Sequence, residues 1–82
     1  MNEVYLPELG EDIDKATIAC WHKKVGDAVD VDDDIVEVVT DKATFNVSAG
    51  HEGILKEIRF KEGKEAKIGD CLAVIEPRRS KG

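Results

Sequence analysis

The sequence has 82 residues, of which 41% are hydrophobic and 37% charged, and this size predicts one small globular domain with an economical core. No apolar run approaches the ~20 residues that cross a bilayer, and no signal sequence opens the chain, so we expect a cytoplasmic or, in a eukaryote, mitochondrial-matrix protein without a membrane partner. The formal net charge of −6 argues against nucleic acid as a partner and favours partners that present positive charge.

Short strands are expected along the whole chain, because β-branched residues dominate its apolar segments and no segment sustains a helical period. The expected strands cover residues 3–6, 16–24, 28–30, 34–39, 44–48, 53–60, 65–67 and 71–76. We therefore assign residues 1–76 to one all-β domain. Residues 77–82 begin with Pro77 and contain no apolar anchor, which is typical of the start of a flexible linker or tail.

The expected strands form two related halves, offset by the 37 residues that separate Gly26 from Gly63. Both glycines follow a Lys-x motif in a predicted tight turn, where positive φ carries no steric cost for glycine. The pattern predicts a flattened barrel or two small sheets packed face to face, with each half supplying one apolar face. The same offset also matches Ile18 with Leu55, Trp21 with Ile58, Val31 with Ile68, Asp33 with Asp70 and Ile35 with Leu72.

A four-residue turn is predicted between two strongly β-forming runs, Val38-Val39 and Thr44-Phe45. Asp41 and Lys42 occupy the centre of this turn, so a primary amine is expected at the tip of a hairpin. The offset of 37 places Lys42 opposite position 79, in the departing tail. The amine and the tail should therefore leave the domain at opposite ends.

The segment Val36–Ala43 resembles the modification hairpin of the biotinyl/lipoyl domain family, in which Asp-Lys-Ala marks the lipoyl subgroup. The resemblance extends to the first glycine turn at residues 21–29, and it covers about residues 3–76 as a whole. It implies a barrel-sandwich hybrid of two four-stranded sheets with an internal quasi-twofold duplication, and a modified lysine at an exposed turn. In the second half the similar segments are residues 53–55, 62–63, 68–70 and 72–76.

The resemblance implies that Lys42 forms an amide with lipoic acid, which takes the formal net charge from −6 to −7. The domain would be a carrier without catalytic residues of its own, in a parent chain that is a dihydrolipoamide acyltransferase. It would move acyl groups and reducing equivalents among the components of a 2-oxoacid dehydrogenase complex. The implied partners are a lipoate ligase or lipoyl transferase, a thiamine-diphosphate-dependent 2-oxoacid decarboxylase, the acyltransferase core and dihydrolipoamide dehydrogenase.

Asp41 and Ala43 are candidate recognition residues, because a modifying enzyme must find Lys42 among nine lysines by the shape and neighbours of its turn. A second hypothesis is that Asp41 stabilises the turn through its side chain. The resemblance further implies that the loop after Pro7 lies near the modified turn and helps a decarboxylase to choose its own domain. The candidate residues of this loop are Glu8, Leu9, Gly10 and Glu11.

Two other functions stay open on the same scaffold. A biotin carrier domain resembles this chain in fold, but its lysine is flanked by methionines, whereas Met1 is the chain's sole methionine. An unmodified lipoyl-like binding scaffold would keep the duplicated strands without needing Lys42. A glycine-cleavage carrier also bears a lipoyl-lysine, but it would need additional helices, for which this sequence has no room. The 2-oxo acid and the number of lipoyl domains in the parent chain do not follow from the sequence.

No metal site is expected. Cys20 and Cys71 are too few for a disulfide framework and show no metal-ligand spacing, so both are interpreted as partly buried thiols. The acidic run 30–34 lacks the glycine and terminal glutamate of a calcium loop and is interpreted as a solvated turn. His22 and His51 are interpreted as ordinary surface or strand residues.

Overall fold

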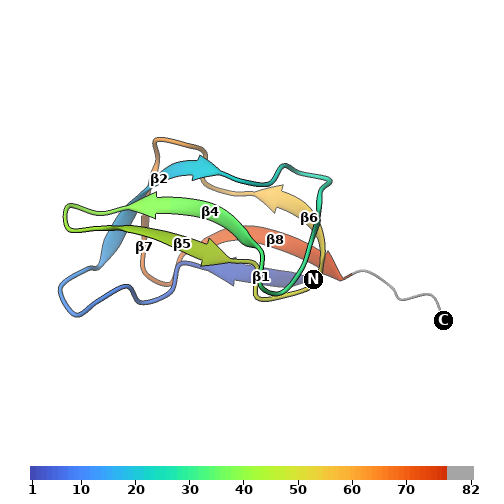
Figure 1. Ribbon diagram of the computed structural model, residues 1–82, viewed down its shortest axis with the longest axis horizontal. Coiled ribbons are helices and arrows are strands. Elements are labelled where there is room, and N and C mark those ends of the chain that lie inside the picture. The colour runs from blue at the N-terminus through green and yellow to red at the C-terminus, as the bar shows by residue number, and fades with distance from the viewer. Residues whose placement is uncertain (78–82) are drawn as a thin grey trace.

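The computed structural model describes residues 1–77, which form eight strands in two antiparallel sheets (Figure 1). One sheet has the order β1-β8-β6-β3 and the other β5-β4-β2-β7, which confirms the expected all-β sandwich of two four-stranded sheets. No helix in the described range is long and apolar enough to cross a membrane. The strands are β1 (Asn2–Tyr5), β2 (Lys15–Trp21), β3 (Ala28–Val29), β4 (Asp34–Val39), β5 (Thr44–Ser48), β6 (Gly53–Ile58), β7 (Glu65–Lys67) and β8 (Cys71–Pro77).

Strands β2 and β6 end earlier than the sequence predicted, at Trp21 and Ile58 instead of residues 24 and 60. Each contains an irregularity of register that is typical of a β-bulge, in β2 between Ile18 and Cys20 and in β6 at the equivalent place, 37 residues later. A bulge bends its strand and increases the local twist. Both strands therefore leave their sheet soon after the bulge. The alternation of residue types alone does not reveal the residue at which each strand ends.

The two halves exchange a short strand. One sheet combines β2, β4 and β5 of the first half with β7 of the second, and the other combines β6, β8 and β1 with β3. The expectation that each half supplies one whole apolar face is wrong in this respect. The reason is that a glycine turn precedes both β3 and β7 and carries the chain across to the opposite sheet, where β3 pairs with β6 and β7 with β2.

Each of the two glycine turns joins the halves through an equivalent pair of backbone hydrogen bonds. Gly26 and Gly63 have φ of 100° and 90°, which confirms the positive φ predicted for both. The Gly26 amide donates to the Leu55 carbonyl, and the Gly63 amide to the Ile18 carbonyl, each at 2.8 Å. The amides of Ile18 and Leu55 in turn donate to the carbonyl of the residue after each glycine, at 2.8 and 2.9 Å. This exchange repeats with the offset of 37.

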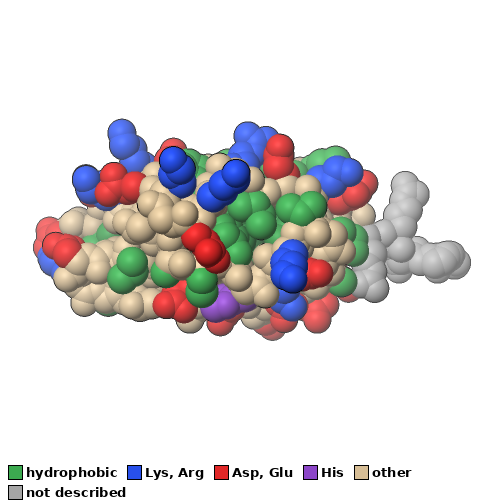
Figure 2. Space-filling view, turned by 90° about the horizontal axis from the view of Figure 1, so that it is seen from above, with side chains coloured by type: hydrophobic (Ala, Val, Ile, Leu, Met, Phe, Trp, Pro, Cys, Tyr) green, Lys and Arg blue, Asp and Glu red, His purple; other side chains and the backbone are tan. Residues whose placement is uncertain are grey.

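The core between the sheets is built from equivalent positions of the two halves. Ile18, Leu55, Ile35 and Leu72 are at most 1% exposed. Burying a side chain of this size contributes about 1.5–3 kcal/mol. No buried polar or charged side chain lies among the described residues, so the interior is a uniform apolar layer. On the outside, Figure 2 shows basic and acidic side chains interspersed along one edge of the face, beside a cluster of hydrophobic side chains.

The β4–β5 turn lies at one end of the described chain, and the N-terminus and the end of β8 lie toward the other (Figure 1). The described chain finishes with β8, whose last residue, Pro77, pairs with Gly53. Pro77 was assigned to the linker, so the last strand extends one residue further than the sequence predicted. Residues 78–82, which hold most of the expected linker or tail, lie outside the described residues. The β4–β5 turn is therefore clear of the N-terminus and of the end of β8.

Candidate functional site

Lys42 lies at the tip of the β4–β5 hairpin, as predicted. The last strand pair is Val39 with Thr44, and the Thr40 amide then donates to the Ala43 carbonyl at 2.8 Å, which closes the turn. The Lys42 side chain is 56% exposed. No non-glycine residue of the described chain has positive φ, so the turn imposes no such backbone strain on its residues. The Lys42 amine therefore extends from a short turn that is closed by a backbone hydrogen bond.

The Thr40 hydroxyl is the side-chain group that organises this turn. It accepts hydrogen bonds from the backbone amides of Lys42 and Ala43, at 3.1 and 3.0 Å, and donates one to the Ala43 carbonyl at 3.0 Å. From the sequence, stabilisation of the turn by the Asp41 side chain was one of two hypotheses for that residue, and the role of Thr40 was not predicted. In residues 1–77 the Asp41 carboxylate makes no hydrogen bond to the turn, whereas a threonine at its first position does so in the manner of an ST turn.

The loop that joins β1 to β2 packs beside the turn, as the sequence predicted. Its point of contact is Asp12, whose Oδ2 lies 3.6 Å from Lys42 Nζ, with the two side chains 81% and 56% exposed. Such an exposed pair contributes little to stability, about 0–1 kcal/mol. Its significance is the position of a carboxylate beside the amine. The loop was expected near the turn but the contact of Asp12 was not predicted, because strand pairing decides which loop residue reaches the hairpin.

The four loop residues predicted for recognition have different environments. Glu8 and Glu11 are exposed, Leu9 is half-buried against the core, and the Gly10 carbonyl accepts a hydrogen bond from the Ile13 amide at 3.2 Å. Leu9 and Gly10 therefore fix the path of the loop, and the two glutamates are free to meet another molecule. The recognition role of all four stays a prediction.

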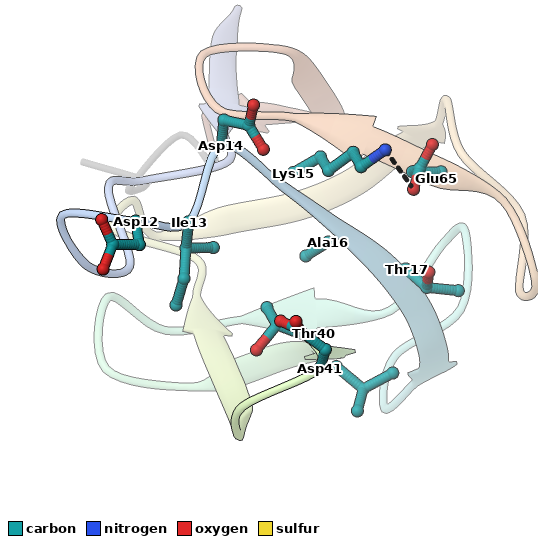
Figure 3. A pocket seen from close by; sticks show the side chains of 10 residues that line it. Asp12, Ile13, Asp14, Lys15, Ala16, Thr17, Thr40, Asp41 and Glu65 are labelled. Atoms are coloured by element: carbon teal, nitrogen blue, oxygen red, sulfur yellow. Dashed lines mark ion pairs between the residues drawn. The ribbon is translucent and has the colours of Figure 1, made fainter.

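A shallow hollow of about 530 Å³ separates the loop from the hairpin (Figure 3). Four acidic residues and one lysine contribute to its wall, and that lysine, Lys15, is paired with Glu65 at 3.6 Å. The hollow is therefore a negatively charged surface that reaches to the base of the Lys42 turn. Its lining residues are Asp12 to Thr17, Val39, Thr40, Asp41 and Glu65.

The acidic run 30–34 forms a turn, as interpreted from the sequence. The Asp33 carboxylate accepts a hydrogen bond from the Asp30 amide at 2.9 Å, and the Asp33 amide donates to the Asp30 carbonyl at 3.1 Å. Asp70 makes the same two bonds with Lys67, at 2.9 Å each. The repetition in both halves identifies Asp33 as a turn residue of the scaffold.

Cys20 and Cys71 are both half-buried free thiols, as expected.

Comparison with known proteins supplies independent information on this chain. A family model described as "Biotin-requiring enzyme" matches residues 2–75. The dihydrolipoyllysine-residue succinyltransferase component of the 2-oxoglutarate dehydrogenase complex from Staphylococcus saprophyticus is 44% identical over 75 residues, which are 92% of this chain and 18% of that protein. The dihydrolipoyllysine-residue acetyltransferase component of the pyruvate dehydrogenase complex from Corynebacterium glutamicum is 39% identical over 72 residues, which are 88% of this chain and 11% of that protein. The chain thus spans less than a fifth of these relatives.

Two solved structures share the fold. The lipoyl domain of the 2-oxoglutarate dehydrogenase complex from Azotobacter vinelandii is 36% identical, with a TM-score of 0.73, and the alignment covers 93% of this chain and 96% of that one. The urea carboxylase of Kluyveromyces lactis has a TM-score of 0.78 over 92% of this chain and 6% of that one, at 24% identity. The second similarity concerns the fold alone.

Proposed function

This chain belongs to the biotinyl/lipoyl domain family, and we propose that it is a lipoyl carrier domain in which Lys42 bears the lipoyl group. The observation that carries the proposal is the exposed amine of Lys42 at the tip of a hydrogen-bonded hairpin on the family's scaffold. Asp41 and Ala43 flank it in the pattern of the lipoyl subgroup. The similarity to a lipoyl domain over nearly the whole chain gives further support.

Attachment of the group changes the charge of the turn. An amide on Lys42 Nζ is neutral, so it removes the positive charge that now faces Asp12 at 3.6 Å. Asp12 and Asp41 then remain as uncompensated carboxylates at the base of the arm, next to the acidic hollow. We infer that the lipoylated end attracts partner surfaces that present lysine and arginine side chains.

The chain's own part in the reaction cycle is to hold and present the arm. When bound, the lipoyl group supplies a dithiolane that can carry an acyl group and two reducing equivalents. The Thr40 hydroxyl and the backbone bonds of the turn fix the point from which the arm extends. Tethering makes each transfer effectively intramolecular, with local concentrations that reach about mM. Catalysis would then reside in the partner enzymes.

The proposed partners are a lipoate ligase or lipoyl transferase, a thiamine-diphosphate-dependent 2-oxoacid decarboxylase, the acyltransferase core and dihydrolipoamide dehydrogenase. The names of the similar acyltransferase components, one of a 2-oxoglutarate and one of a pyruvate dehydrogenase complex, support a complex of this class. Reductive acylation of the lipoylated chain by a 2-oxoglutarate and a pyruvate decarboxylase, measured side by side, will identify the 2-oxo acid.

Biotin is the second cofactor that the family can carry. The similarity to urea carboxylase does not favour it, because at this identity only the fold is shared. The residues on either side of Lys42 are an acid and an alanine, whereas the biotin carriers that the chain resembles have methionines there. The flanking residues therefore favour the lipoyl group.

The proposal is tested by incubating the 82-residue chain with lipoate ligase, ATP and lipoate and measuring its intact mass. We expect one lipoyl addition, mapped to Lys42 by peptide analysis, and no addition with a biotin ligase and biotin. Lys42→Arg should keep the fold and accept nothing, because arginine retains the charge but has no acylable amine. The matched control is Lys56→Arg, an exposed lysine on β6, which should be modified like the parent chain. Lipoylation of Lys42→Arg, or refusal of the parent chain by the ligase, would refute the assignment.

A further inference from the structure

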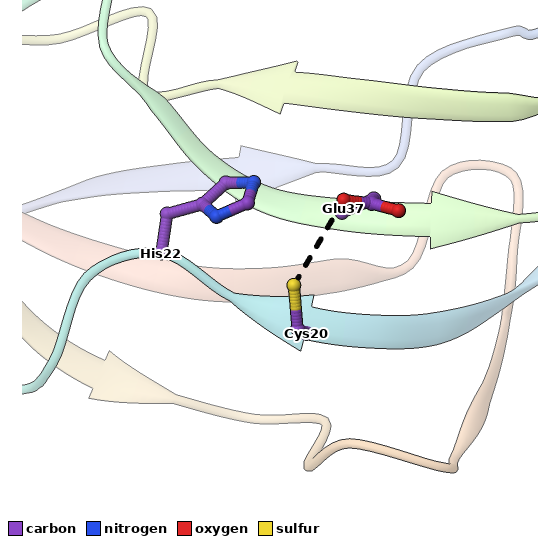
Figure 4. Close-up of side chains that lie close together, drawn as sticks. All are labelled: Cys20, His22 and Glu37. Carbon is purple, nitrogen blue, oxygen red and sulfur yellow. Dashed lines mark hydrogen bonds between the residues drawn. The ribbon is translucent and has the colours of Figure 1, made fainter.

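Three potential metal ligands meet on the outer face of the sheet that contains β2 and β4. They are Cys20 on β2, His22 just beyond its end and Glu37 on β4, and one ligand atom of each lies within 4.8 Å of the others (Figure 4). Cys20 and Glu37 are direct cross-strand partners, and Cys20 Sγ lies 3.9 Å from Glu37 Oε1. All three side chains are at least partly exposed, so an ion can reach them from solvent.

The bulge in β2 creates this arrangement. Regular alternation after Ala16 and Ile18, which are both buried, would turn Cys20 toward the core. The extra residue between Ile18 and Cys20 reverses the alternation, so that Trp21 packs against the core and Cys20 lies beside Glu37. The sequence shows no metal-ligand spacing here, because the three ligands come from two strands and their convergence depends on the β-bulge.

The donor set fits zinc. A tetrahedral Zn²⁺ with bonds of about 2.0–2.3 Å to sulfur, nitrogen and oxygen holds its ligand atoms roughly 3.3–3.6 Å apart. Movement of the three side-chain ends by about 1 Å would reach that spacing, within the freedom of exposed side chains. A thiolate and a carboxylate together balance the double charge of the ion, and a neutral imidazole adds none.

Asn46 orients the imidazole ring of His22 through a hydrogen bond. His22 Nε2 lies 3.2 Å from Asn46 Oδ1 on the neighbouring strand β5, where Asn46 is the cross-strand partner of Glu37. Because an amide oxygen can only accept, the bond places the proton on Nε2 and leaves the lone pair of the neutral ring on Nδ1. Hydrogen bonds of this kind orient the histidine ligands of zinc sites.

The internal duplication allows the three ligand positions to be compared with their equivalents in the second half of the chain. At the equivalent positions of the second half, Glu57 and Arg59 form an ion pair at 3.1 Å, and Val74 replaces the carboxylate of the opposite strand. The fold therefore does not require a cysteine, a histidine and a glutamate at these places.

We propose that Cys20, His22 and Glu37 bind one Zn²⁺ ion, with water as the fourth ligand. Binding displaces the Cys20 thiol proton to solvent and forms a zinc–thiolate bond, with no change of oxidation state. Glu37 lies five residues before Lys42 along β4 and its turn, and the metal site shares no residue with the proposed carrier site.

Titration of the 82-residue chain with Co²⁺ and then Zn²⁺ tests the proposal. Tetrahedral cobalt–thiolate complexes absorb in the near ultraviolet and the visible, and Zn²⁺ should displace the cobalt and abolish both bands. Cys20→Ser should remove the thiolate band, and His22→Gln and Glu37→Gln should each weaken zinc binding by at least about tenfold, while Asn46→Ala should weaken it by about tenfold through the histidine. Each variant is checked for its amide NMR spectrum and for lipoylation of Lys42, which should both be retained.

The matched control is Cys71→Ser, a half-buried free thiol whose Sγ lies 3.4 Å from the Ala73 carbonyl in the other sheet. It should leave the cobalt spectrum and the zinc affinity unchanged. Equal zinc affinities of Cys20→Ser and Cys71→Ser, or a cobalt complex without a thiolate band, would overturn the proposed site. Loss of lipoylation in the parent chain would instead count against the carrier function and leave the metal site unaffected.

Discussion

Replacing Thr40 by valine tests whether one hydroxyl holds the carrier turn. The substitution keeps the β-branched shape and removes three hydrogen bonds, two accepted from the amides of Lys42 and Ala43 and one donated to the Ala43 carbonyl. A net hydrogen bond contributes about 0.5–1.5 kcal/mol, and water can replace part of it at an exposed turn, so the three together should be worth about 1.5 kcal/mol. In a domain of this size that corresponds to a loss of roughly 6–12 °C in Tm.

Calorimetry of Thr40→Val, Thr40→Ser and the parent chain measures this loss. Thr40→Ser keeps the hydroxyl and should retain most of the stability. We also expect Thr40→Val to lower the kcat/KM of lipoate ligase, because a less ordered tip must be fixed again when the enzyme binds it. Equal Tm values for the valine and serine variants would show that the hydroxyl does not support the turn, and the attribution to Thr40 would then fail.

Three further substitutions test the scaffold and the loop. Gly53→Ala should lower the free energy of unfolding by about 3 kcal/mol or more in a denaturant titration, because the added methyl would lie 2.1 Å from the Glu76 carbonyl oxygen; a loss no greater than that of Gly10→Ala would contradict this. Gly26→Val should cost about 1–3 kcal/mol in the same measurement, since its φ of 100° is strained for valine although the surrounding space is open. An unchanged free energy of unfolding would argue against the assigned turn. Asp12→Asn should change the free energy of unfolding by no more than about 0.5 kcal/mol. It should lower the kcat/KM of the decarboxylase for the lipoylated chain by up to about fivefold. Equal kcat/KM values for the parent chain and the variant at low salt would show that Asp12 is not part of the recognition surface.

The sequence is sufficient to predict features that depend on local chemistry. β-branched segments place the longer strands, the apolar–polar alternation repeated in the two halves places β3 and β7, and glycine after a Lys-x pair places the positive-φ turns at Gly26 and Gly63. The hairpin that carries Lys42 follows from two β-forming runs separated by four residues. Each of these depends on residues that are neighbours along the chain.

Three features that depend on how distant strands meet were not predicted. The exchange of β3 and β7 between the sheets is decided by the direction in which a glycine turn sends the chain. The contact between Asp12 and Lys42 requires the pairing of β2 with β4, which brings the loop before β2 to the turn after β4. The convergence of Cys20 with Glu37 further requires a bulge, which reverses the facing of every later residue in its strand.

The duplication offers a physical criterion for separating scaffold from function. A feature that recurs at the offset of 37, such as the Gly26 and Gly63 turns or the Asp33 and Asp70 carboxylates, solves a folding problem that both halves share. A feature found in one half alone has no such explanation from the fold. The closed turn with Lys42 at its tip is of the second kind, because the equivalent strand pair, β8 with β1, joins the two ends of the described chain and has no turn between them. The same reasoning sets the Cys20 and Glu37 pair apart from its ion-paired equivalent, so substitutions of Lys42, Cys20 and Glu37 should change modification or binding far more than stability.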